Sequence, residues 1–556
     1  MGAAPLGVLM QQEKATQAPD TSPVRHTSDL IVYEMHVKGF TQHRSSGVGE
    51  DLRGTFAGVK EKIPHLLELG VTAVELMPVF QYDPQEGNYW GYMPLFFFVP
   101  HADYAMNSEA CQIRQEFQDM VSAFHEVGIE VLLDVVYNHT GEMSQNGPAY
   151  NLKLIDNDTY YMSNADNTGY ADFSGTGNSL RCASPAVRQL IVDSLRFWVQ
   201  EMGVDGFRFD LASVFTRNSD GSINFDEPAI FSQIMGDPVL QQVRLIAEPW
   251  DAKGAYQLGR MFPGVTWFQW NGRFRDGVQR FFRGDEDMVG EMMTRVYGSA
   301  DLFPDSLNPT FHPFQSINYV VSHDGSTLRD LVSYNKKYNE ANGHNNTDGP
   351  NEFGWNCGHE GIENVPEDVA QLRRQQMRNF LGLLLVSNGT PMLRMGDEFG
   401  QTQGGNNNPY NQDNETSWLN WDLLDTHKDF FRFARLMIAF RKDHPSLARS
   451  RFWRDDVHWY GTGSQAHWSR ESKHFAFCVH GANINDDDIY IMLNAHDETK
   501  TFTVQENGPW LRVVNTALPS PQDILAPVDY VELADPTIEV KAHSMVVLLK
   551  KQSSHN

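Results

Sequence analysis

The stretch that decides the fold is GFRFDLAS, residues 206–213. It is a short apolar run that carries Arg208 and ends at Asp210, so a carboxylate lies beside a fixed cation. A neighbouring cation favours the ionised form of a carboxyl group, and a carboxylate nucleophile must be ionised. We therefore expect a strand whose end presents a reactive acid.

Three other apolar runs also carry an acid at or near one end. DVVYNHT begins with Asp134, LIAEPWD contains Glu248, and NYVVSHDGS contains Asp324. In a (β/α)8 barrel, catalytic groups come from the C-terminal ends of several different strands. Together with Asp210, these acids therefore indicate one active site assembled from dispersed segments.

Strand and helix patterns alternate around these runs. Strand patterns are expected at residues 30–37, 73–77, 130–136, 207–210, 243–247, 266–270, 317–322 and 392–395, the sixth being weaker than the first five. Helical periodicity follows at 58–69, 111–127, 185–202 and 228–241 and again after the later strands. Eight strand-then-helix units in one direction predict an α/β fold built as a parallel (β/α)8 barrel.

The chain divides into three predicted parts. Residues 1–25 are rich in Ala, Gln, Pro and Ser and are expected to form a tail or linker. Residues 26–445 would form the catalytic barrel, with a long insertion at 138–184 between the third strand and its helix. Long loops of this kind shape substrate clefts. Residues 446–556 show short alternating runs between polar turns, which predicts a C-terminal antiparallel β-sandwich.

The net charge of the chain limits the classes of partner that it could bind. The chain has 71 acidic and 44 basic residues and a formal charge of −27, which argues against nucleic acid or an anionic membrane as partner. A neutral glucan would not be repelled, although the acidity could equally serve solubility alone.

Cysteine use and the N-terminus bear on location. The four cysteines are far apart without a CxxC pair, which favours neither a disulfide framework nor a zinc site. No apolar run reaches the ~18 residues of a membrane span, and the first twenty residues lack the basic start of a secretory signal. We expect an intracellular protein, in the cytoplasm or alternatively in the plastid stroma. Oligomeric state has no signal in the sequence.

In this order, the four acidic segments resemble the four sequence regions of the α-amylase clan of retaining α-glycosidases. Such enzymes need two carboxyl groups roughly 5 Å apart, an ionised nucleophile and a protonated acid. Asp210 suits the first task. Glu248 suits the second, because it ends the apolar run LIA and precedes Pro249 and Trp250, surroundings that should raise its pKa. Each acid alone could be a cap or an ion-pair partner, but the ordered set favours catalysis.

The resemblance implies further roles. Asp324 would be the third acid, which stabilises the transition state, with His139 and His323 as hydrogen-bond donors in the same subsite. Asp134 would orient Arg208.

Aromatic residues and a possible metal ligand complete the expected site. Tyr92, in NYWGYM, matches the clan's aromatic residue that stacks on glucose at the cleavage point, and Trp250 is expected to bind substrate. Asn138 matches an asparagine that helps to bind calcium in many α-amylases, but the Asp-rich spacing of a calcium loop is missing. We interpret Asn138 as a residue that makes a structural hydrogen bond, and we predict no metal and no cofactor.

Three segments of the sequence indicate which members of the α-amylase clan this chain resembles. Enzymes that cut α-1,4 bonds commonly have Lys-His where this chain has Ser213 and Val214. The segment AEPWD and the segments at 323–343 and 404–418 resemble isoamylases and glycogen debranching enzymes, which hydrolyse α-1,6 branch points of glycogen, amylopectin or their dextrins. Because GGNNNPYNQDNETSW at 404–418 is very polar, we expect it to be a loop that contacts substrate rather than a packing element.

The sequence departs from the debranching family at two points, and two alternative functions remain open. Ser326 stands where that family usually has Phe, and only residues 4–9 resemble the segment that joins the family's preceding β-sandwich, so we expect that module to be missing here. An α-1,4-acting hydrolase or glucanotransferase would attack linear amylose. A non-catalytic glucan-binding subunit is the other alternative, and the presence of Asp210, Glu248 and Asp324 weighs against it.

Overall fold

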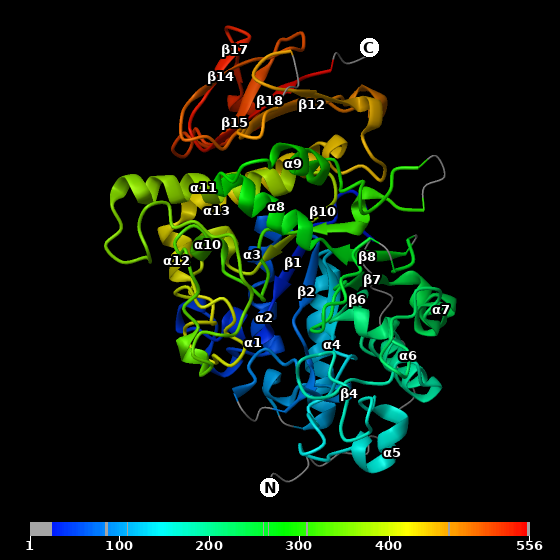
Figure 1. Ribbon diagram of the computed structural model, residues 1–556. Coiled ribbons are helices and arrows are strands. Elements are labelled where there is room, and N and C mark those ends of the chain that lie inside the picture. The colour runs from blue at the N-terminus through cyan, green and yellow to red at the C-terminus, as the bar shows by residue number, and fades with distance from the viewer. Residues whose placement is uncertain are drawn as a thin grey trace.

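The computed structural model describes residues 25–83, 87–107, 109–259, 261–264, 266–306, 310–464 and 468–552. Apart from Arg25, the predicted tail at 1–25 lies outside these ranges. The described chain forms a barrel surrounded by helices, with a sheet domain packed on one side of it (Figure 1).

Eight parallel strands close the barrel in the order β1-β10-β9-β8-β7-β6-β5-β2, which confirms the predicted (β/α)8 fold. Their bounds are β1 Val32–Met35, β2 Ala73–Leu76, β5 Glu130–Val135, β6 Gly206–Phe209, β7 Arg244–Ala247, β8 Trp267–Trp270, β9 Ser316–Asn318 and β10 Thr390–Arg394. All 34 strand residues are buried, as expected of parallel strands covered on both faces. The short hairpin of β3 (Phe80–Tyr82) and β4 (Pro94–Pro100) precedes the third barrel strand.

Helices surround the barrel, and two of them differ from the predicted bounds. The helix expected at 58–69 is two helices, α2 (Phe56–Lys60) and α3 (Ile63–Leu69), and the second starts where Pro64 fits the first turn. The helix expected at 228–241 ends as α7 (Ala229–Gly236), because Asp237 precedes Pro238 and takes an extended conformation. The other helices are α1 Val37–Thr41, α4 Ala110–Glu126, α6 Pro185–Gln200, α8 Gly272–Arg283, α9 Val289–Val296, α10 Leu328–Leu331, α11 Glu367–Val386, α12 Asp422–Thr426 and α13 Lys428–Asp443.

The insertion at 138–184 contains α5 (Leu152–Tyr160) and is organised by a buried acid. Glu142 accepts hydrogen bonds from the main-chain N–H groups of Tyr150 and Asn151 at 2.6 and 2.9 Å and from the Tyr161 hydroxyl at 2.5 Å. Its carboxylate replaces the regular backbone pairing that the loop lacks.

The C-terminal domain is an antiparallel β-sandwich whose two sheets differ in size. A six-stranded sheet in the order β11-β12-β13-β18-β15-β16 faces the two-stranded sheet of β14 and β17. The bounds are β11 Val457–Tyr460, β12 His474–Val479, β13 Asp488–Asn494, β14 Lys500–Thr503, β15 Leu511–Asn515, β16 Val531–Glu532, β17 Thr537–Val540 and β18 Ser544–Lys550. One apolar cluster fills the space between the sheets and includes Phe502 and Val540 from the small sheet.

The other face of the large sheet packs on the barrel helices. The ring centroids of Phe475 (β12) and Phe281 (α8) are 5.6 Å apart, and Met545 (β18) fills the space over Gly382 (α11). Both domains therefore share one continuous apolar cluster.

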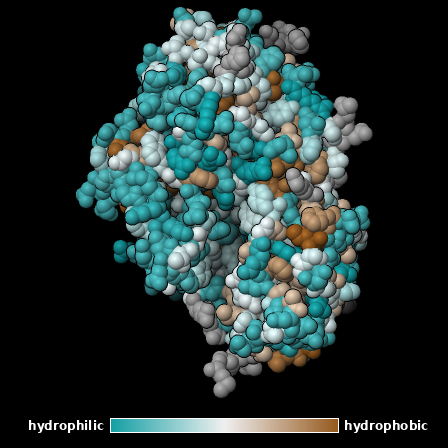
Figure 2. Space-filling view, viewed as in Figure 1, coloured by the Kyte–Doolittle hydropathy of each residue, from teal (hydrophilic) through white to brown (hydrophobic). Residues whose placement is uncertain are grey.

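No helix in the described ranges is long and apolar enough to cross a membrane. In the view of Figure 2 the surface is mostly hydrophilic, and the hydrophobic residues occur in small separate groups.

Candidate active site

A buried arginine lies at the centre of the site. Arg208 on β6 has no exposed surface, and its Nη1 lies 2.9 Å from both carboxylate oxygens of Asp134 on β5 and 3.1 Å from Oδ1 of Asp210. Its Nη2 lies 2.9 Å from Oε1 of Glu248. The indole of Trp270 at the end of β8 covers the guanidinium at 4.2 Å, a cation–π contact. One guanidinium therefore brings together acids from three neighbouring strand ends.

Asp210 receives a second donor from Asn138. The Asn138 amide nitrogen donates to Oδ2 of Asp210 at 2.7 Å and to its main-chain oxygen at 2.9 Å. The donors from Asn138 and Arg208 fix the orientation of the Asp210 carboxylate. Asn138 thus makes the kind of structural hydrogen bond that the sequence interpretation assigned to it.

The environment of Glu248 favours its protonated form. Its side chain is buried, and burial raises its pKa to about 8 although Arg208 acts to lower it. The carboxyl is therefore largely protonated at neutral pH, the state required of a general acid.

A strained residue connects Asp210 and Glu248. Leu211 follows Asp210 with φ 41° and ψ 49°, in the left-handed region that non-glycine residues rarely adopt. This conformation lets its N–H donate to Oε2 of Glu248 at 2.7 Å. Backbone strain of this kind concentrates at functional sites.

Tyr92 and His323 form the other side of the site. The Tyr92 hydroxyl donates to Oδ2 of Asp134 at 2.5 Å and lies 2.9 Å from Nε2 of His323, whose Nδ1 lies 2.6 Å from Glu34. Burial acts to lower the pKa of His323, but Glu34 outweighs it and the pKa is raised. The Tyr92 ring stacks on the His323 ring at 5.2 Å, so one of its faces is occupied by protein.

His139 departs from its expected role as a donor to sugar. Its Nε2 lies 2.6 Å from the main-chain oxygen of Tyr92, and its Nδ1 lies 2.5 Å from Oδ1 of Asn138. Both ring nitrogens of His139 are engaged by protein, and the ring connects Tyr92 with the asparagine that holds Asp210. His323 is likewise engaged at both nitrogens, by Glu34 and Tyr92.

Asp324 and Trp250 remain available for a ligand. Asp324 is half-buried, and within the described ranges its carboxylate has neither a hydrogen bond nor an ion pair. Trp250 is half-buried and lies nearly parallel to Tyr256, with ring centroids 6.0 Å apart and planes at 6°.

The polar segment at 404–418 is only partly what its composition predicted. Asn406 and Asn407 are buried, and their amides bond to Asn342 at 2.8 Å and to Glu352 at 2.9 Å, in the preceding long loop. These amides connect two loops, so the expectation of a sugar-contacting role is wrong for these two side chains. Polar side chains are buried here because each has a partner. Ser326 belongs to the same network, since its N–H and hydroxyl both donate to Glu352.

Sequence reasoning missed three members of the site: Glu34, Trp270 and the Leu211 N–H. A signal existed for Glu34, which is an acid inside the apolar run LIVYEMHV. A buried charge needs a partner, and the partner is His323 in the segment that follows β9. Trp270 resembled an ordinary core aromatic at a strand end, and nothing in the sequence marked the backbone strain at Leu211.

The sequence profiles of two known protein families match this chain. The profile described as "Alpha amylase, catalytic domain" matches residues 35–169 and 156–468, and "Isoamylase 1-3, C-terminal" matches residues 458–552.

Similar proteins extend the match to nearly the whole chain. It is 44% identical to "Isoamylase 3, chloroplastic" of Oryza sativa subsp. japonica over 545 residues, which are 94% of this chain and 68% of the relative. It is 43% identical to "Glycogen operon protein GlgX homolog" of Mycobacterium tuberculosis, over 96% of this chain and 78% of that protein. The chain belongs to the isoamylase and glycogen debranching family of the α-amylase clan.

Solved structures agree with the fold of this debranching-family member. Type I pullulanase of Bacillus subtilis str. 168, complexed with maltose, superposes with a TM-score of 0.76 at 23% identity, covering 98% of this chain and 73% of the pullulanase. Pullulanase of Paenibacillus barengoltzii in complex with maltohexaose and α-cyclodextrin gives a TM-score of 0.73 at 24% identity, over 96% and 79%. The barrel and the C-terminal sheet domain are thus the architecture shared with these proteins.

Proposed function

We propose that this isoamylase-type debranching glycosidase hydrolyses α-1,6 branch linkages by a retaining double displacement, with Asp210 as nucleophile, Glu248 as general acid and base, and Asp324 as stabiliser of the transition state. The observation that carries this assignment is the shared contact with Arg208, which holds Asp210 and Glu248 side by side while burial raises the pKa of the Glu248 carboxyl. A retaining mechanism needs such a pair.

The first step transfers a proton and forms a covalent bond. Glu248 gives its proton to the bridging oxygen while Asp210 attacks the anomeric carbon, so the main chain leaves with a free C6 hydroxyl and the branch becomes bound to Asp210 through its anomeric carbon. Water then attacks the same carbon, Glu248 takes its proton, and Asp210 leaves as a carboxylate. Asp324 would bind sugar hydroxyls, and its lack of a hydrogen-bond or ion-pair partner within the described ranges supports this assignment.

Substrate contacts belong to the same proposal. We assign Trp250 and the free face of Tyr92 as sugar-stacking surfaces. Asp134, Arg208, His139 and His323 act mainly by positioning other groups, because each is engaged by protein.

The setting is also a proposal. The substrate would be glycogen, amylopectin or a trimmed dextrin inside the cell, in keeping with relatives named for a glycogen operon or a chloroplast. We take 26–445 as the catalytic domain and 446–556 as the C-terminal domain, supported by the end of α13 at Asp443 and the start of β11 at Val457.

Treatment of amylopectin tests the reaction. The enzyme should release unbranched chains and increase the iodine colour, and linear amylose should remain intact. The Asp210→Asn variant, which has nearly the same shape, should lose activity by ~10²–10⁴ or more. Equal attack on amylose would reject the α-1,6 assignment in favour of an α-1,4-acting enzyme.

A further inference from the structure

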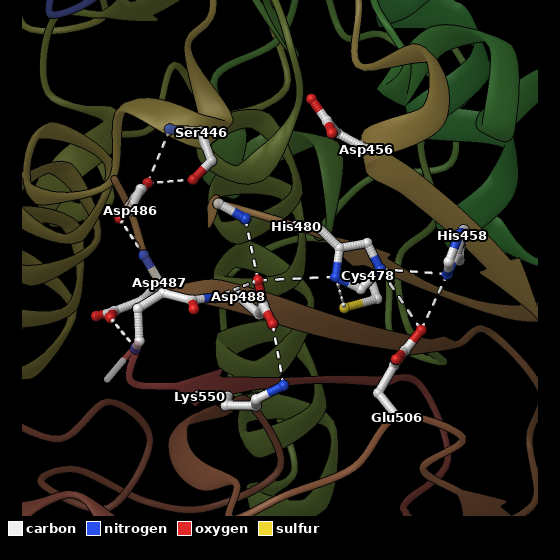
Figure 3. Close-up of polar contacts among 12 residues, drawn as sticks. Ser446, Asp456, His458, Cys478, His480, Asp486, Asp487, Asp488, Glu506 and Lys550 are labelled. Atoms are coloured by element: carbon white, nitrogen blue, oxygen red, sulfur yellow. Dashed lines mark hydrogen bonds and ion pairs between the residues drawn. The ribbon is translucent and has the colours of Figure 1, made fainter. Parts of the chain in front are cut away.

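Three potential metal ligands from separate segments meet at one edge of the C-terminal domain (Figure 3). His458 lies on the edge strand β11, His480 directly follows β12, and Glu506 follows β14. Because His458 pairs with Cys478 in the antiparallel ladder, His458 and His480 are diagonal neighbours on the same face of the sheet. That face is turned toward the small sheet, from which Glu506 extends.

The ligand atoms form a nearly regular triangle. Nδ1 of His458 lies 3.2 Å from Nε2 of His480 and 3.0 Å from Oε1 of Glu506, and the His480 and Glu506 atoms are 3.5 Å apart. Tetrahedral zinc with bonds of 2.0–2.1 Å has ligand atoms about 3.3 Å apart. We propose that His458, His480 and Glu506 bind one zinc ion.

The surroundings provide the support that zinc ligands usually have. The second ring nitrogen of His480 faces Oδ1 of Asp488 at 3.7 Å, and Asp488 is held by the Gly481 N–H at 3.0 Å and by Lys550 at 3.2 Å. A carboxylate behind a ligating histidine orients the ring and raises its basicity.

The exposure of the three side chains fits a zinc site that is open to solvent at its fourth coordination position. The His458 side chain is 55% exposed, and those of His480 and Glu506 are 23% and 22% exposed, so an ion can enter from solvent. The Tyr460 hydroxyl donates to the same Glu506 oxygen at 2.5 Å and fixes the carboxylate. Water would complete the coordination.

A second group of possible ligands in the domain fits a metal less well. Asp486 already accepts from Nδ1 of His444 and from the Ser446 N–H, both at 2.9 Å, and Asp487 pairs with Lys551 at 2.7 Å. In that group a cation, the Lys551 ammonium, already occupies one of the carboxylate oxygens that a metal would need.

The bound zinc would connect the two sheets of the sandwich. It would fix the edge strand β11 to β12 and to the segment after β14, in the C-terminal sheet domain and not in the barrel that contains β6 (Figure 1). This proposal departs from the sequence prediction of no metal, which rested on linear spacing. The ligands come from three segments that only the folded sheets bring together.

Zinc titration of the metal-free full-length protein tests the proposal. Calorimetry with ZnCl2 in a non-chelating buffer should give one strong site, and zinc should raise the melting temperature. Cobalt(II) should give the intense visible absorption of a tetrahedral site. The isosteric Glu506→Gln variant and His458→Ala should weaken zinc binding at least tenfold, with the debranching rate unchanged.

His474→Ala is the matched control. His474 and His496 in the same domain also place ring nitrogens 3.1 Å apart, but in the described ranges no carboxylate oxygen joins them to complete a triad. This variant should bind zinc like the parent. The proposal is overturned if the parent shows no saturable zinc binding, if Glu506→Gln and His458→Ala bind zinc like the parent, or if the control loses the site.

Discussion

At the scale of single residues, Glu34 is the least expected member of the site, because it acts through its contact with the His323 ring. Replacing it with Gln keeps the shape but weakens hydrogen bonds to a charged group, each worth about 1.5–3 kcal/mol, so kcat/KM on branched dextrin should fall ~10–100-fold. The pKa of His323 should also fall, as followed by its imidazole NMR signal, since Glu34 raises it. Unchanged kinetics and titration would exclude the positioning role.

Glu75 provides the matched comparison. It is buried on β2, and burial raises its pKa well above the usual value, which favours the protonated form. Gln resembles that neutral form, and Glu75→Gln should therefore keep kcat/KM within about threefold. A loss as large as that of Glu34→Gln would mean that both substitutions act through general damage to the barrel.

Glu248 gives a prediction about pH. Its pKa of about 8 in the folded state lies above its unfolded value, so the folded state binds the extra proton and stability falls as pH rises through this interval. Glu248→Gln cannot lose that proton, so its melting temperature relative to the parent should rise between pH 5 and pH 8.5. The parent's kcat/KM should decline through about pH 8, where the acid loses its proton. A constant difference in melting temperature would contradict the assigned pKa.

At the scale of elements, the turn after β6 stores strain at Leu211. A left-handed conformation costs a non-glycine residue about 1–2 kcal/mol, and glycine avoids that cost. Both Leu211→Ala and Leu211→Gly remove the side chain, but the Gly variant should be the more stable by about 1 kcal/mol in urea unfolding. Greater stability of the Ala variant would show that this residue is not strained.

The order of elements was predictable because buried parallel strands give unbroken apolar runs and the helices between them are amphipathic. The ends of the elements were less predictable. Residues 319–322 continue the apolar pattern beyond β9, but β9 stops pairing at Asn318. Asp134, Arg208, Asp210 and Glu248 could be found since each lies at or near an end of an apolar run. Contacts between distant segments, such as Trp270 on Arg208, have no linear pattern to reveal them.

At the scale of the whole molecule, the barrel and the C-terminal domain should unfold together, because one apolar cluster spans both. Phe475→Ala removes a ring that packs on Phe281 and should cost about 3–5 kcal/mol. Val528→Ala, at a side chain that is 92% exposed, should leave stability unchanged. Calorimetry of the parent that resolved two separate transitions would contradict the single cooperative unit.

The central claim is that Asp210 attacks the sugar while Glu248 serves as acid and base. Incubation with a fluorinated α-glucosyl fluoride, which slows release of the covalent intermediate, followed by peptide mass spectrometry, tests it most directly. The account predicts one glycosylated peptide with the sugar on Asp210, and slower loss of that adduct in Glu248→Gln because the base is missing. A sugar on another carboxylate, or steady turnover without any adduct, would contradict it.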